Sequence, residues 1–386
     1  MRIIIIGIEE DIEEVSSFIN HEGNTVDILF WHDYDQIYDL ILRKTSYDVC
    51  IIAVRDEELA DAIVEQTARN FGIEHRKIIN YYFFYHATIP LMKMERVLSI
   101  PRKNYDGIIL GISNSEVGII PEILGNNFIN LSVSSQDLFY NLKTLEYMKE
   151  NYPERIKSIQ YLILDMFDYT YFNFDISLSK TVFNYYSYGG YILDEHNFEK
   201  NENVNYSFDE GIKTLTSKRY KDITEDQITL WYSLFGDVHK KDGYKGYKEI
   251  DEIYKRNRIV SDDEVKRYIY EQSIVKNVFE NTISENIAVF DQIIELARLI
   301  NPDIRIVCVI LPQYIKGMDC NQNLYFDWKE RFYKIMDRAI EKYHIEFYDY
   351  QEDEMSYNPL YYQDVKHLNY IGAIRFSKKL KQRLFC

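Results

Sequence analysis

DGIILGISNSEVG, residues 106–118, passes from an apolar run through a glycine to two serines at the point where a helix is expected to begin. The segment GIIL has the continuous apolar character of a buried strand, and Gly111 marks the turn after it. In open parallel sheets, ligands bind beyond the carboxyl ends of the strands. Either Ser113 or Ser115 is therefore a candidate nucleophile, and the alternative is that the two serines cap the helix.

Alternating strand and helix patterns continue from this stretch towards the C-terminus. Strands are predicted at residues 106–113, 128–134, 160–167, 305–312 and 345–350, with a long helix at 137–156. Such alternation predicts an α/β domain with a parallel sheet covered by helices. We assign residues 99–386 to this domain and expect a helical insertion at about residues 196–285, where the sequence is charged and rich in tyrosine.

A separate α/β pattern fills residues 1–98 and predicts a Rossmann-like domain. Strands are predicted at 2–8, 26–31, 48–54 and 75–83, with helical segments between them at 9–23, 33–45 and 58–72. Gly7 follows the first strand, but Glu9, Glu10 and Asp11 come next and would repel a pyrophosphate. We therefore expect no dinucleotide cofactor here, and favour a sugar-nucleotide or purely structural role for this domain.

Composition narrows the range of partners. The formal net charge of −17 over 386 residues opposes nucleic acid, which is held by clustered lysine and arginine. The four cysteines show no metal-ligand or disulfide spacing, so we expect no metal, no cofactor and a reduced, cytoplasmic location. The apolar run near the N-terminus is too short to span a membrane.

Asp364 and His367 form a second element near the C-terminus, three residues apart and just before an apolar-periodic helix. A serine hydroxyl becomes a good nucleophile when a base takes its proton, and histidine suits that task near neutral pH. A carboxylate on the other ring nitrogen fixes the tautomer. The alternative is that Asp364 only caps the last helix and His367 is an ordinary residue of its first turn.

The order of these residues resembles the SGNH (GDSL-like) hydrolase superfamily, especially its branch related to bacterial surface-polymer acylation proteins. Gly111, Ile112 and Ser113 match the Gly-Asp-Ser block, with Ile in place of Asp, and Asp364 and His367 match the last block. The resemblance covers about residues 104–195 and 290–385. It implies a three-layer α/β/α domain, a Ser-His-Asp mechanism with Ser113 as nucleophile, and acyl ester substrates, often acetylated carbohydrate. Ser115 is left a capping or supporting role.

The blocks that would form the oxyanion hole are less well matched. The resemblance implies a backbone N–H from Ser113 and another from a position that Ser134 or Ser135 fills here. The Gly-x-Asn-Asp block is missing; Asn173 is the candidate for its amide, and Asp165 would present the wrong charge to an oxyanion.

The predicted function is a serine esterase or O-acyltransferase acting on a small-molecule or carbohydrate acyl ester. Gln313 and Tyr314 follow the strand at 305–312, so we expect them to contact the substrate. One alternative is a non-catalytic protein that uses the same crevice to bind a glycan or a nucleotide sugar. Another is an assembly component of a polysaccharide system, in which the helical insertion forms a lid, a homo-oligomer surface or a contact with a partner.

Overall fold

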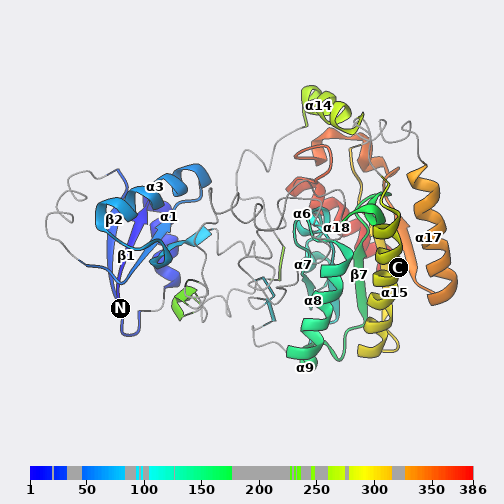
Figure 1. Cartoon of the computed structure of the whole chain (residues 1–386), viewed down its shortest axis with the longest axis horizontal. Helices are drawn as coiled ribbons and strands as arrows, with labels where there is room; N and C mark the ends of the chain where they lie inside the picture. Colours follow the sequence, from blue (N-terminus) through cyan, green and yellow to red (C-terminus); the bar gives the residue numbers. More distant parts are fainter. Residues whose placement is uncertain are drawn as a thin grey trace. The chain divides into compact units, whose positions relative to one another are not determined.

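The computed structural model describes two compact units, Met1–Ile100 with Phe183–Tyr244 and Pro101–Val182 with Lys245–Cys386 (Figure 1). The described residues are 1–19, 21–32, 46–82, 93–94, 97–98, 104–125, 127–175, 227, 230–231, 233–235, 245–247, 260–273, 278–314 and 327–385. Most of the predicted insertion at 196–285, and the helix predicted at 33–45, lie outside these residues.

The first unit contains a four-stranded parallel sheet in the order β2-β1-β3-β4. Its strands are β1 (Arg2–Gly7), β2 (Thr25–Phe30), β3 (Val49–Ala53) and β4 (Ile78–Asn80). Side chains alternate between faces, so Ile3 and Ile5 pack with α1 (Glu9–Phe18), while Ile4 and Ile6 pack with α3 (Glu57–Phe71). The predicted α/β pattern of this region is confirmed.

Part of the predicted insertion belongs to the core of this first unit. Trp231 and Phe235 lie 5.3 and 5.0 Å from the ring of Tyr81, measured between ring centroids. Leu234 is also fully buried in the same cluster as β1 and α1. The insertion is thus divided, because α14 (Asp262–Ser273) instead packs through Val265 into the core of the second unit.

The second unit contains a five-stranded parallel sheet in the order β6-β5-β7-β8-β9. Its strands are β5 (Gly107–Leu110), β6 (Phe128–Asn130), β7 (Tyr161–Asp165), β8 (Arg305–Ile310) and β9 (Glu346–Asp349). β6 ends four residues before the predicted strand does, because the Asn130 side chain accepts the Ser132 N–H at 3.0 Å and turns the chain.

Helices cover both faces of this sheet (Figure 1). Ile109, Ile163 and Val307 form one core with residues of α7 (Pro121–Leu124) and α18 (Tyr370–Phe385), and α18 also contacts α6 (Ser113–Gly118). The intervening strand residues are also buried and point to the opposite face. There α8 (Leu138–Asn151) packs on α15 (Glu280–Ile300), and α15 packs on α17 (Trp328–Tyr343).

The strand order defines where a ligand site is expected. From β5 the chain moves outward to β6, then crosses back to β7 on the other side of β5. This reversal opens a crevice beyond the carboxyl ends of β5 and β7, the usual ligand position in such sheets. Ser113 follows β5 and Asp165 ends β7, so both residues lie at this edge.

Candidate active site

The His367 ring lies within hydrogen-bond distance of Ser113 on one side and of Asp364 on the other, although Ser113 and His367 are 254 residues apart in the chain. The His367 Nε2 atom lies 2.7 Å from Ser113 Oγ, and its Nδ1 atom lies 2.9 Å from Asp364 Oδ2. The side chains of His367 and Asp364 are 24% and 42% exposed, so a ligand can reach this group. The structure therefore brings together the three residues predicted to be catalytic.

Local hydrogen bonds hold the histidine in this position. Asp364 Oδ1 accepts the backbone N–H groups of Lys366 and His367, each at 2.8 Å, and so fixes the bend between them. Burial disfavours the charged form of Asp364, but the His367 ring and these two N–H groups keep the pKa of its carboxyl below the ordinary value. Asp364 is thus a carboxylate at neutral pH, suited to stabilise a charged imidazole.

The turn that carries Ser113 is held by hydrogen bonds of Ser115. The Ser115 N–H donates to Asp165 Oδ2 at 2.9 Å, and its hydroxyl lies 2.8 Å from Ser132 Oγ and 3.1 Å from the Ile112 carbonyl oxygen. Neither serine is the N-cap of α6, because Ile112 holds that position without a side-chain cap hydrogen bond, and the Ser115 N–H is bound by Asp165 instead. The contacts of Ser115 with Asp165 and Ser132 agree with the supporting role expected for this residue.

Ser134 and Ser135, the two candidates for the second oxyanion block, differ in their backbone amides. The Ser134 N–H donates to Glu116 Oε2 at 2.9 Å, and the Ser134 hydroxyl donates to the same oxygen. Ser135 adopts a φ of 64°, a conformation that glycine favours. Within the described residues the Ser135 amide has no hydrogen-bond partner, so Ser135 is the better candidate of the two.

The loop carrying Ser135 is joined directly to the loop carrying Ser113. The Val133 N–H donates to the Gly111 carbonyl oxygen at 3.3 Å, and the Leu131 N–H donates to that of Ile109 at 2.8 Å. The amide of Ser113, like that of Ser135, has no partner in the part of the chain that the structure describes. Two N–H groups without partners among the described residues thus lie on adjoining loops, and an oxyanion hole is built from donors of this kind.

Asn173 and Asp165 occupy structural positions. Asn173, at the end of the short helix η2 (Tyr171–Asn173), accepts the Phe279 N–H through Oδ1 at 2.7 Å and so ties η2 to the start of α15. Asp165 is fully buried, and its two carboxylate oxygens face backbone N–H groups. The Asn173 amide oxygen is thus bound to the backbone of Phe279, and the Asp165 carboxylate to the backbone of two loops.

Gln313 and Tyr314, the two residues expected to contact the substrate, are buried side chains. Gln313 is 0% exposed and Tyr314 is 4% exposed. The Gln313 amide donates to the Phe167 carbonyl oxygen at 3.1 Å, and the Tyr314 N–H donates to that of Val365 at 2.9 Å. These two residues support the loops after β7 and before α18, and their contact with a substrate stays a prediction.

Sequence reasoning missed the group around Lys366. Its ammonium lies 4.5 Å from the Phe167 ring centroid, 5.5 Å from that of Tyr268, and 3.8 Å from Asp168 Oδ2. Lys366 stands between Asp364 and His367 in the chain, and this position was the available signal. The group joins the histidine loop to the loop after β7.

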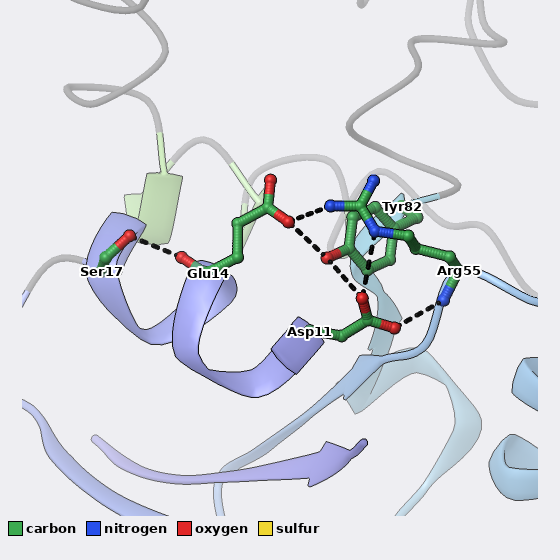
Figure 2. A network of polar contacts seen from close by, with 5 residues as sticks. All are labelled: Asp11, Glu14, Ser17, Arg55 and Tyr82. Atoms are coloured by element: carbon green, nitrogen blue, oxygen red, sulfur yellow. Dashed lines mark hydrogen bonds and ion pairs between the residues drawn. The ribbon is translucent and has the colours of Figure 1, made fainter. Parts of the chain in front are cut away.

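The corresponding edge of the first sheet is closed by charged side chains (Figure 2). The Arg55 guanidinium lies between the carboxylates of Asp11 and Glu14, with its Nε 3.0 Å from Asp11 Oδ1, and the Tyr82 hydroxyl lies 2.9 Å from Glu14 Oε2. The Arg55 N–H also donates to Asp11 at 3.1 Å. Carboxylates therefore stand where a pyrophosphate would bind in a dinucleotide fold.

No protein-family model matches this chain, and no curated protein matches it in sequence. Among the residues that the structure describes, no helix combines the length and the apolar character needed to cross a membrane.

Proposed function

We propose that this protein is a serine esterase or O-acyltransferase of the SGNH type, acting on an acyl ester of a carbohydrate or a surface-polysaccharide precursor. The observation that carries the proposal is the 2.7 Å contact between Ser113 Oγ and His367 Nε2, with Asp364 on the other ring nitrogen. Hydrogen-bond reach between nucleophile and base, and between base and carboxylate, is what this chemistry requires. The first unit supplies a separate α/β domain of the Rossmann-like class.

In the proposed reaction, Ser113 Oγ attacks the ester carbonyl carbon while its proton passes to His367 Nε2. The C–O bond to the leaving alcohol then breaks, and the alcohol oxygen takes the proton back from His367. Water, or an acceptor hydroxyl, then attacks the acyl carbon while its proton passes to His367. The bond from the acyl carbon to Ser113 Oγ breaks, and Ser113 Oγ takes the proton back from His367. The Asp364 carboxylate stabilises the ring while it carries both protons.

The negative charge that develops on the carbonyl oxygen needs preorganised donors. The proposal assigns this role to the backbone N–H groups of Ser113 and Ser135. Ser134 is excluded from it because its N–H is bound to Glu116. Glu116 has a supporting role, since it holds the loop that presents Ser135.

Replacement of Ser113 by alanine tests the proposal. We expect Ser113→Ala to abolish turnover of p-nitrophenyl acetate and labelling by a fluorophosphonate probe, because the hydroxyl is the group that forms the covalent bond. Ser284→Ala is the matched control, since Ser284 lies on the exposed face of α15 and its hydroxyl donates to the Glu280 carbonyl oxygen. Undiminished turnover and labelling in Ser113→Ala would exclude the mechanism.

A second candidate is a non-catalytic protein that binds a glycan or a nucleotide sugar in the same crevice. The missing Gly-x-Asn-Asp block favours it, because Asp165 places a carboxylate at the end of β7. An activated serine reacts with a fluorophosphonate, whereas an unactivated serine does not. Glycan binding by a wild-type chain that resists labelling would favour this candidate.

A further inference from the structure

We propose that Asp165 is a positioning residue that sets the place of the Ser113 hydroxyl, an assignment that rests on the proposed role of Ser113 as nucleophile. Asp165 is the last residue of β7, beside β5 in the sheet and at the reversal of strand order. The resemblance to SGNH hydrolases does not predict this role, because a carboxylate at this position has the wrong charge to face an oxyanion. The contacts of the carboxylate carry the inference.

Each carboxylate oxygen of Asp165 holds a different loop. Oδ2 accepts the Ser115 N–H at 2.9 Å, two residues after Ser113, and Oδ1 accepts the Phe167 N–H at 2.8 Å. The first bond fixes the turn between β5 and α6, and the second fixes the turn after β7. The position of Ser113 relative to β7 therefore depends on this one side chain.

The turn closes tightly around Asp165. A methyl group at Gly111 would lie 2.4 Å from Asp165 Cβ and 2.5 Å from Ser115 Oγ, so glycine is required here. The Ser115 hydroxyl continues the network to Ser132 after β6 at 2.8 Å. The ends of β5, β6 and β7 are thus joined through Asp165 and Ser115 in a region without exposed area.

A neutral amide could not reproduce these contacts. Two N–H donors converge on two oxygens, whereas asparagine offers one acceptor and one donor at these positions. Its NH₂ group would face either the Ser115 or the Phe167 N–H, and one loop would move away. A carboxylate is the group of this size that satisfies both amides.

Burying the charged carboxylate costs stability. A residue retained only to stabilise the fold would not carry this cost, so the burial favours a functional role. Burial raises the pKa of Asp165 to about 6, although the Phe167 and Ser115 N–H groups favour its charged form. The side chain is therefore charged at neutral pH without any exposed area. A perturbed carboxyl group beside a candidate nucleophile is typical of functional sites, where the charge is kept at a cost to stability.

The experiment compares Asp165→Asn with the wild-type 386-residue chain, using p-nitrophenyl acetate and a fluorophosphonate probe. We expect kcat and the labelling rate of Ser113 to fall by about tenfold or more, KM to change by less than about twofold, and the unfolding midpoint in urea to stay level or rise. A merely structural role would lower the midpoint and leave the labelling rate of the folded fraction unchanged, and that result would overturn the proposal.

Further variants keep the outcomes distinct. Asp165→Ser removes the carboxylate in a second way, and failure of both variants to fold would assign Asp165 to stability and overturn the proposal. Ser284→Ala is the control for labelling, with its hydroxyl on the exposed face of α15. Equal labelling of Asp165→Asn and wild type would refute this inference alone, whereas an unlabelled wild type would refute the proposed function and this inference with it.

Discussion

Three carboxylates hold the candidate site by accepting backbone N–H groups. Asp165 holds the Ser113 turn through the Ser115 N–H, Asp364 holds the histidine bend, and Glu116 holds the loop that presents Ser135. Hydrogen bonds to charged acceptors are stronger than those between neutral groups, so each loop is fixed at a single residue. At the residue scale the site therefore depends on acids that do not react themselves.

Ser135 carries backbone strain that a single substitution can relieve. Its φ of 64° is unfavourable for a residue with a Cβ atom and easy for glycine. We expect Ser135→Gly to raise the free energy of unfolding by about 0.5 kcal/mol, the strain relieved less the entropy that glycine adds. The labelling rate should stay within about twofold of wild type, because the amide donor remains.

The matched control for this prediction is Ser134→Gly, measured in the same urea unfolding series. This variant removes the hydroxyl that donates to Glu116 and relieves no positive φ. It should lower the unfolding free energy by about 1 kcal/mol. Destabilisation by Ser135→Gly equal to that by Ser134→Gly would contradict the assignment of strain to Ser135.

Asp165 gives the stability of the protein a distinctive dependence on pH. Its pKa is raised from an unperturbed 3.8 to about 6, so between these values the folded state binds a proton more readily than the unfolded state does. Stability from this residue is therefore lost as the pH rises through that window. Between pH 7 and pH 5 the wild type should gain about 1 kcal/mol relative to Asp165→Asn.

Urea unfolding of both chains at the two pH values measures this difference. The Asp364 carboxyl, whose pKa is lowered, works in the opposite direction, since its contribution is present above its unfolded pKa and is lost at lower pH. It is present in both chains and cancels in the comparison. An unchanged difference between pH 7 and pH 5 would mean that Asp165 does not titrate in this window.

The connection between β5 and α6 is the element on which the site geometry depends. We expect Gly111→Ala to lower the free energy of unfolding by about 2 kcal/mol and to remove most of the labelling at Ser113. The added methyl group would meet Asp165 Cβ at 2.4 Å, and neither the buried strand nor the turn can move without displacing the serine. Urea unfolding and fluorophosphonate labelling check the two effects.

Gly125→Ala is the control at the same scale. A methyl group at Gly125 would lie 3.1 Å from a ring atom of Phe128, which can shift slightly, and Gly125 lies outside the Ser113 turn. Its labelling rate should match wild type within about twofold. Equal loss of labelling in both glycine variants would show that the effect of Gly111→Ala is not specific to the turn.

Over the whole molecule, the parts that sequence could predict are those written in local patterns. Strands buried on both faces are continuous apolar runs such as RIIIIG and RIVCVI, and the Asp364 and His367 pair lies within one bend. The contacts of Ser134 with Glu116 and of Ser115 with Asp165 span 18 and 50 residues. They depend on how separate loops meet, which no periodicity encodes, so Ser134 and Ser135 could not be distinguished.

The two units repeat one arrangement of strands with different chemistry at the reversal of strand order. In the second unit a serine and a histidine meet there, and in the first unit the network of Asp11, Glu14, Arg55 and Tyr82 occupies the edge (Figure 2). Asp11 is 6% exposed and is neutralised by Arg55. Removal of one member of such a pair leaves a buried charge without compensation.

We therefore expect Arg55→Met to lower the free energy of unfolding of the first unit by about 2 kcal/mol, a value reduced because Arg55 is itself partly exposed. Each unit has its own core, so labelling at Ser113 should stay within about twofold of wild type.

Calorimetry of wild type, Arg55→Met, Asp11→Asn and the double variant measures the coupling between the pair. Additive effects in that cycle would show that the ion pair does not stabilise this edge, and loss of labelling in Arg55→Met would show that the two cores unfold together.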